Sequence, residues 1–81
     1  MRRPWIDPAL FAIGIDAKSA MPLHRQMFLQ MRALILSGRL KPGQRLPSTR
    51  TLAKEIGVSR NTVAAAFDQL FAEGAIEAHV G

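Results

Sequence analysis

Residues 48–63 of this 81-residue chain read STRTLAKEIGVSRNTV, and their pattern predicts two short helices joined by one sharp turn. Ser48 is placed to cap the first helix, because its hydroxyl can accept a hydrogen bond from a backbone amide that the first turn leaves unpaired. Leu52 and Ile56 then fall on one face of that helix, four residues apart. This arrangement is typical of a helix-turn-helix, a motif that places its second helix in the DNA major groove.

The turn between the two helices has its own signature. Gly57 is expected to end the first helix, since glycine adopts at little cost the left-handed backbone conformation common just past a helix end. Ser59 is expected to cap the second helix, whose buried stripe is formed by Val63, Ala66, Phe67 and Leu70. Ala53 supplies a small side chain where the two helices cross. An ordinary helical hairpin is the alternative, but it does not require this combination of caps, glycine and small residue.

The charge distribution points in the same direction. Residues 39–60 hold six Lys or Arg against Glu55 alone, a net charge of +5, whereas residues 1–38 have a net charge of +3 and residues 61–81 one of −3. The basic block therefore covers the approach to the motif and the start of its second helix, where DNA phosphates would lie. A solvated basic face with no partner is the alternative for any such run of charge.

Length and composition exclude several classes of protein. A single domain of this size buries only about 60 to 65% of its unfolded surface. The chain has no cysteine, which excludes disulfides and thiolate metal sites, and His24 and His79 have no carboxylate at ligand spacing, so no metal site is predicted. No nucleophile stands beside a base, so no catalytic residue and no enzyme activity are predicted. No apolar run reaches the length of a membrane span, and we expect a soluble, cytoplasmic protein.

The first part of the chain is predicted to form an arm and one helix. Residues 1–21 show no sustained helical period and are expected to form an extended arm that packs on its own domain or on a second copy, with Trp5 and Phe11 as candidate contacts. Pro22 is predicted to open a helix that ends at Ser37-Gly38 and buries Leu23, Met27, Met31, Leu34 and Ile35. Leu29 and Leu36 lie on the opposite face and are candidates for contact with another protomer or domain, although isolated exposed leucines are common.

The remaining segments predict a small β wing. Lys41-Pro42-Gly43-Gln44 is a strong turn signal, and residues 44–46 are expected to form a very short strand. Gly74 is predicted to stop the second motif helix, after which residues 75–80 are expected to be extended and to enter a hairpin at Gly81. The predicted fold is therefore mainly α, a winged helix-turn-helix of three helices with a truncated wing over residues 22–81, preceded by the arm.

These segments resemble a known family. Residues 22–26, 35–43 and 45–50, the string Gly57-Val58-Ser59-Arg60-Asn61-Thr62-Val63, and then Gln69-Leu70 and Glu73-Gly74 are similar to the amino-terminal domain of GntR-type bacterial transcription regulators. Pro-Leu-His-Arg-Gln at 22–26 and Ser-Arg-Asn-Thr-Val at 59–63 are most similar to the MocR branch, whose members carry a large carboxy-terminal domain resembling a pyridoxal-phosphate aminotransferase. The resemblance implies a DNA-binding fragment of a longer regulator, in which pyridoxal phosphate and any effector would bind outside this chain.

Candidate DNA contacts follow from helical geometry and from the resemblance. With Val63 at the centre of the buried side, a turn of about 100° per residue directs Asn61, Ala64, Ala65 and Asp68 outward, with Arg60 and Thr62 on the flanks. Asn61 is suited to an adenine edge, and Arg60 to guanine or a phosphate. The resemblance assigns DNA contact to Arg50, Ser59, Arg60, Thr62 and Gly81, and places Arg45 near the DNA backbone.

Ala64 departs from the family pattern, because many GntR-type proteins have arginine there. Ala64 or Ala65 could touch thymine methyl groups, and discrimination would then depend more on Asn61, Arg60, the wing or DNA shape. Simple helix propensity is the alternative explanation for the three consecutive alanines.

The function expected from these patterns is sequence-specific binding to a double-stranded DNA operator by a bacterial regulator that acts as a homodimer in the nucleoid. A winged-helix module for protein contact, with only weak or incidental DNA affinity, is the alternative.

Overall fold

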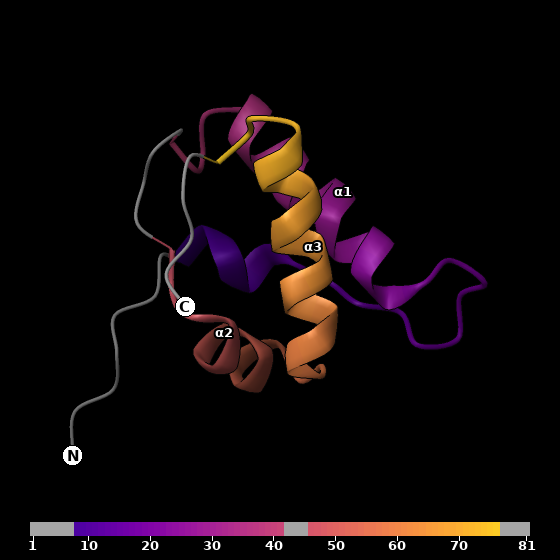
Figure 1. The fold of residues 1–81 in the computed structure, drawn as a ribbon. Helices are drawn as coiled ribbons and strands as arrows, with labels where there is room; N and C mark the ends of the chain where they lie inside the picture. Colours follow the sequence, from indigo (N-terminus) through magenta and orange to yellow (C-terminus); the bar gives the residue numbers. More distant parts are fainter. Residues whose placement is uncertain (1–7, 42–45, 77–81) are drawn as a thin grey trace, which may run out of the picture.

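The computed structural model describes residues 8–41 and 46–76. A 3-10 helix, η1 (Pro8–Ala12), precedes three α-helices: α1 (Leu23–Leu36), α2 (Thr49–Ile56) and α3 (Arg60–Ala72). Helix α3 packs against both α1 and α2 (Figure 1). The prediction of a mainly α fold with three helices is confirmed. The described residues contain no strand, and most of the two segments predicted as strands lies outside them, as does Gly81.

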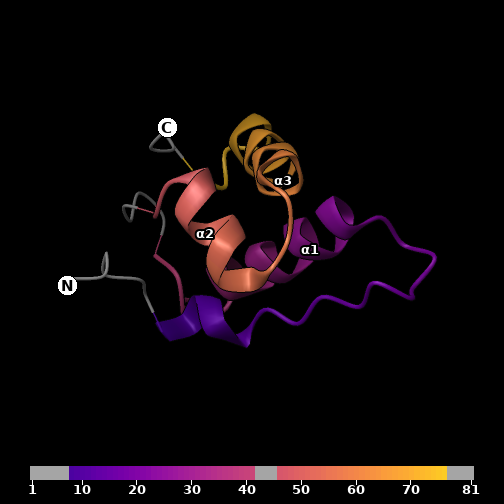
Figure 2. The same ribbon diagram turned by 90° about the horizontal axis from the view of Figure 1, so that it is seen from below.

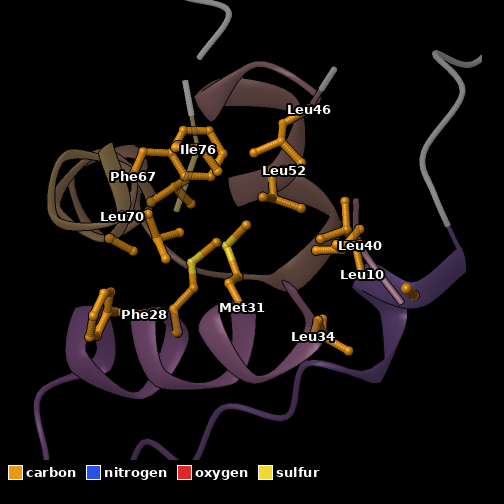
Figure 3. Close-up of a cluster of buried hydrophobic side chains, with 14 of the residues drawn as sticks. Leu10, Phe28, Met31, Leu34, Leu40, Leu46, Leu52, Phe67, Leu70 and Ile76 are labelled. Carbon is orange, nitrogen blue, oxygen red and sulfur yellow. The ribbon is translucent and has the colours of Figure 1, made fainter. Parts of the chain in front are cut away.

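One hydrophobic core joins all the elements. Side chains from α1, α2 and α3 meet there with residues of the connecting segments (Figure 3). The largest of the fully buried side chains, each with at most 2% of its surface exposed, are Phe28, Phe67, Leu10, Met27, Met31, Leu40, Leu52, Leu70 and Val63. All four apolar positions predicted for the buried face of α3 are in this core, which confirms the orientation of that helix.

Helix α1 presents a wider buried face than its predicted stripe. Met27, Met31 and Leu34 are buried as expected, but Phe28 and Gln26 are buried beside them. The prediction that Leu29 lies on the face opposite the core is wrong. Leu29 is half-buried and packs against the core, because the buried face of α1 extends around the helix to reach it. Leu36 keeps the predicted exposure, with 75% of its surface accessible.

The amino-terminal segment is part of the core. An extended arm was predicted, but the structure has η1 there, which buries Ala9 and Leu10, while Phe11 remains 59% exposed. Trp5 lies outside the described residues. Beyond η1 the chain runs along the side of α1 that faces away from α3 (Figure 2). Of the two alternatives predicted for the arm, packing on its own domain is what the described residues 8–15 show, and the extended conformation is wrong for residues 8–12, where η1 is a helical turn that buries Leu10.

The ends of α1 and α3 meet at one end of the molecule. Ser37 caps α1 and donates its N–H to the carbonyl of Ala33, and the N–H of Leu40 returns to the carbonyl of Leu34 at 3.0 Å, which carries the Leu40 side chain into the core. Arg32 of α1 forms an ion pair with Glu73, just beyond α3, with 3.5 Å between Nε and Oε1. Both side chains are nearly half exposed, so this pair adds little stability.

Candidate nucleic-acid interface

Ser48 caps α2 as its position in the sequence predicts. Its backbone is extended, and its hydroxyl oxygen accepts a hydrogen bond from the Thr51 N–H at 3.2 Å. The same hydroxyl lies 3.1 Å from Thr51 Oγ1. The cap satisfies one of the amides that the first turn of a helix leaves unpaired, so α2 has a defined starting point.

The turn between α2 and α3 is formed by Gly57 and Val58. Gly57 has a φ of +86° and a ψ of 35°, which is the left-handed conformation expected for it. Its N–H donates to the Ala53 carbonyl at 2.8 Å, and the Val58 N–H donates to the same oxygen at 3.0 Å. A Cβ added at Gly57 would meet no atom within 4 Å. Glycine is therefore favoured here by backbone conformation alone, and not by lack of space.

Ser59 caps α3 with the same geometry as Ser48 caps α2. Its hydroxyl accepts from the Thr62 N–H at 3.1 Å and lies 2.9 Å from Thr62 Oγ1. The Ser-x-x-Thr pattern thus occurs twice, at 48–51 and 59–62, with the same role. At the other end of α3, Gly74 follows the cap residue Glu73 with a φ of +75°, so the four predicted helix-end residues are all found in their expected roles.

The first turn of α3 is open to solvent. Ser59, Arg60 and Asn61 are exposed, whereas Thr62, Ala64 and Ala65 are half-buried and Asp68 is exposed again further along the helix. The outward orientation predicted for Asn61 and Asp68 is confirmed. Thr62 differs from Asn61 because its hydroxyl is paired with the cap, which leaves the Asn61 amide as the neutral hydrogen-bonding group that points outward from this turn.

Arg50 and Arg60 come together at one place on the surface. Both arginines line a surface hollow whose other lining residues are Ser48 and Thr49. Neither guanidinium has an ion-pair partner among residues 8–41 and 46–76. The first turns of α2 and α3 also contribute the partial positive charge of helix amino ends. Two cations without an ion-pair partner among the described residues, beside two helix starts, make this part of the surface suited to anionic groups such as phosphates.

Only some of the predicted DNA-contacting residues lie close together in the structure. Arg50, Ser59, Arg60 and Asn61 lie together around the starts of the two motif helices, and Ala64 lies one turn further along α3. Arg45 lies outside the described residues. Thr49, the first residue of α2, lies beside Arg50 and lines the same hollow.

Residues 8–41 and 46–76 contain no group of three His, Asp or Glu side chains that could hold a metal ion. Within the same ranges, no helix is long and apolar enough to cross a lipid bilayer.

A capped pair of helices joined by a left-handed glycine, with cations beside the exposed first turn of the second helix, defines a helix-turn-helix domain of the DNA-binding class. A family model described as "Bacterial regulatory proteins, gntR family" matches residues 23–81. The chain belongs to the GntR family of bacterial regulatory proteins and forms its winged helix-turn-helix DNA-binding domain.

Two relatives illustrate the match. The chain is 48% identical over 67 residues to the probable rhizopine catabolism regulatory protein MocR of Rhizobium meliloti, an alignment that covers 83% of this chain and 14% of the relative. It is 46% identical over 65 residues to the HTH-type transcriptional repressor YtrA of Bacillus subtilis, covering 80% of this chain and 50% of the relative. The chain thus spans half or less of the length of these two relatives.

A solved structure shares the fold. YtrA from Sulfolobus acidocaldarius, a GntR-family transcription factor, superposes with a TM-score of 0.73 at 45% sequence identity, over 76% of this chain and 66% of the other. The resemblance proposed from sequence, including the similarity to a MocR regulator, is confirmed.

Proposed function

We propose that this chain reads a specific sequence in double-stranded DNA, as the DNA-binding end of a bacterial transcription regulator. One observation carries the proposal: the exposed first turn of α3 presents Asn61, while Arg60 and Arg50 share a hollow beside it with no ion-pair partner among residues 8–41 and 46–76. Asn61 has the donor and acceptor pair that fits an adenine edge in the major groove. The two arginines have the charge that phosphates require.

Each side chain has a distinct role in this proposal. Arg50 holds a phosphate from the first turn of α2, and Arg60 holds a phosphate or forks onto a guanine. Asn61 reads the base edge, and the half-buried Ala64 and Ala65 allow α3 to approach thymine methyl groups closely. The Ser59–Thr62 hydroxyl pair holds the first turn in shape, so that the Asn61 backbone is fixed before DNA binds.

The proposal extends to the assembly. A single helix-turn-helix reads a short half-site, so a homodimer on two half-sites would supply the affinity that one module lacks. The alignment covers only 14% of the MocR relative, which supports a longer protein. The resemblance to the MocR branch implies that its carboxy-terminal domain would bind pyridoxal phosphate and an effector. Such a regulator would act in the bacterial cytoplasm, on the nucleoid.

The test is a titration onto DNA. Duplexes selected by this chain from a random library, and scrambled copies of them, are titrated by fluorescence anisotropy at two or more salt concentrations. Arg50→Ala and Arg60→Ala should each lower the salt slope by about one if each contacts a phosphate. Asn61→Ala should cost roughly 1 to 3 kcal/mol on the selected duplex and little on the scrambled one.

Arg32→Ala is the matched control, because it removes the same charge at the opposite end of α3, where Arg32 pairs with Glu73. It should leave the salt slope unchanged. Failure of the chain to prefer any selected duplex over its scrambled copy would reject sequence-specific binding.

A further inference from the structure

The outward face of α3 changes character along its length. The residues on this stripe recur at helical spacing, and they are Asn61, Ala64, Ala65, Asp68 and Ala72. The first of them lies beside the arginine-lined hollow. Beyond Asn61 the stripe has no Lys or Arg, and its one charged group is the Asp68 carboxylate.

Asp68 is placed where it can act on bound DNA. It lies seven residues beyond Asn61, which is about 10.5 Å along the helix axis and within about 20° of the same direction. The alanines between them are too short to shield the carboxylate. Asp68 is exposed, and no side chain among residues 8–41 and 46–76 offsets its charge by an ion pair.

The charges along α3 therefore run from positive to negative. The first turn has Arg60, the neighbouring Arg50 and the positive end of the helix dipole. Asp68 follows in the direction of the negative end of the dipole, whereas the Glu73 carboxylate, just beyond α3, is paired with Arg32. Next to a polyanion, such a gradient attracts the first turn and repels the second half of the helix.

We propose that Asp68 is a positioning residue that keeps the second half of α3 away from the DNA backbone, so that α3 enters the groove by its first turn. This inference rests on the proposed DNA binding and adds a determinant of selectivity. On the correct site, base contacts from the first turn already hold the helix in this orientation. On other sequences the helix can lie in many orientations, including flat against the phosphates, and Asp68 penalises those that bring the carboxylate close to them.

The expected effect is a change in selectivity. Asp68→Asn removes the charge and preserves the shape of the side chain. A unit charge about 8 Å from a phosphate in water corresponds to a two- to three-fold change in affinity at low salt. Asp68→Asn should therefore tighten binding to the scrambled duplex about two- to three-fold, with a smaller change on the selected duplex. Asp68→Lys should tighten binding to the scrambled duplex further, by roughly four- to nine-fold.

The experiment compares wild type, Asp68→Asn, Asp68→Lys and Asp16→Asn on the selected and scrambled duplexes at several salt concentrations. Asp16→Asn is the matched control, since Asp16 is exposed on the arm and asparagine can still accept the bond that its Oδ1 receives from the Lys18 N–H. Urea unfolding of each variant confirms that the fold is retained. A steeper salt dependence on scrambled DNA for Asp68→Asn supports the proposal, because a merely structural role would not change it.

Two results would overturn the inference while leaving the proposed function intact. If wild type is selective and Asp68→Asn binds both duplexes as wild type does, Asp68 has no positioning role. If Asp68→Asn weakens binding to the selected duplex alone, Asp68 reads a base instead, as a carboxylate can by accepting from the cytosine N4 amine. If wild type shows no selectivity, the proposed function itself fails.

Discussion

The side-chain amide of Gln26 forms a two-way hydrogen-bonded pair with the backbone of Asp16. The Asp16 N–H donates to Gln26 Oε1 at 2.8 Å, and Gln26 Nε2 donates to the Asp16 carbonyl at 2.9 Å and to the Met21 carbonyl at 2.8 Å. One turn along α1, Gln30 exchanges bonds with Gly14 in the same way, at 2.8 and 2.6 Å. Two amides on one helix face therefore hold the returning arm as a neighbouring strand would.

Gln26→Ala should destabilise the fold more than Gln30→Ala. Gln26 is 8% exposed, and its loss removes three hydrogen bonds and leaves backbone groups of the arm without partners. We expect a loss of about 1 to 3 kcal/mol in the free energy of unfolding, measured by urea denaturation. The Gln30 bonds are exposed, so water can replace them, and Gln30→Ala should cost less. Equal losses would contradict the importance of burial at Gln26.

Leu10→Ala should show that the arm belongs to the folded unit. Leu10 is 1% exposed, in the same core as Met31 and Leu52. Truncation of a buried leucine costs about 2 to 5 kcal/mol. Phe11→Ala is the adjacent control and should change the free energy of unfolding by less than about 0.5 kcal/mol, because Phe11 is 59% exposed. A neutral Leu10→Ala would mean that the arm does not contribute to the core.

Gly57→Ala should cost about 1 to 2 kcal/mol of stability, because an L-residue is strained at a φ of +86°. Gly14→Ala is the control that separates this backbone strain from steric crowding by the added Cβ. Both positions have no atom within 4 Å of an added Cβ, but Gly14 does not have a positive φ. Thermal unfolding of the two variants should therefore differ, and similar melting temperatures would contradict the conformational explanation.

Ser59 substitutions should separate folding from DNA binding. Ser59→Ala removes the α3 cap and should cost about 0.5 to 2 kcal/mol. Ser59→Asp can still cap the helix and favours the helix dipole, so it should preserve the free energy of unfolding. Its negative charge beside Arg60 should nevertheless weaken DNA binding in an anisotropy titration. Wild-type affinity for Ser59→Asp would place the DNA elsewhere on the surface.

The helix-turn-helix could be predicted because its determinants are local. The two serine caps, Gly57 and the apolar stripe of α3 act within a few residues along the chain, and the structure has all of them in their predicted roles. The outward position of Asn61 follows from the same helical period. These are interactions between a residue and its own helix, which the order of residues specifies directly.

The parts that sequence reasoning missed depend on the packing of one element against another. The pattern placed Leu29 on an exposed face. In the structure the buried side of α1 is wider, because α3 packs against one side of this helix and the arm, hydrogen-bonded to Gln26, packs against another. Likewise, η1 was missed because a helix of five residues is too short to show a periodic pattern in the sequence. It is stabilised by burial of Leu10.

The sequence by itself determined that this protein has a helix-turn-helix with a basic approach and an exposed reading turn, since caps, a left-handed glycine and a 3.6-residue period are local properties. Only the tertiary structure decided that Arg50 and Arg60 share one hollow and that the arm enters the core. The distance between residues on two different helices depends on how those helices cross, and the crossing depends on side chains from the whole core packing together.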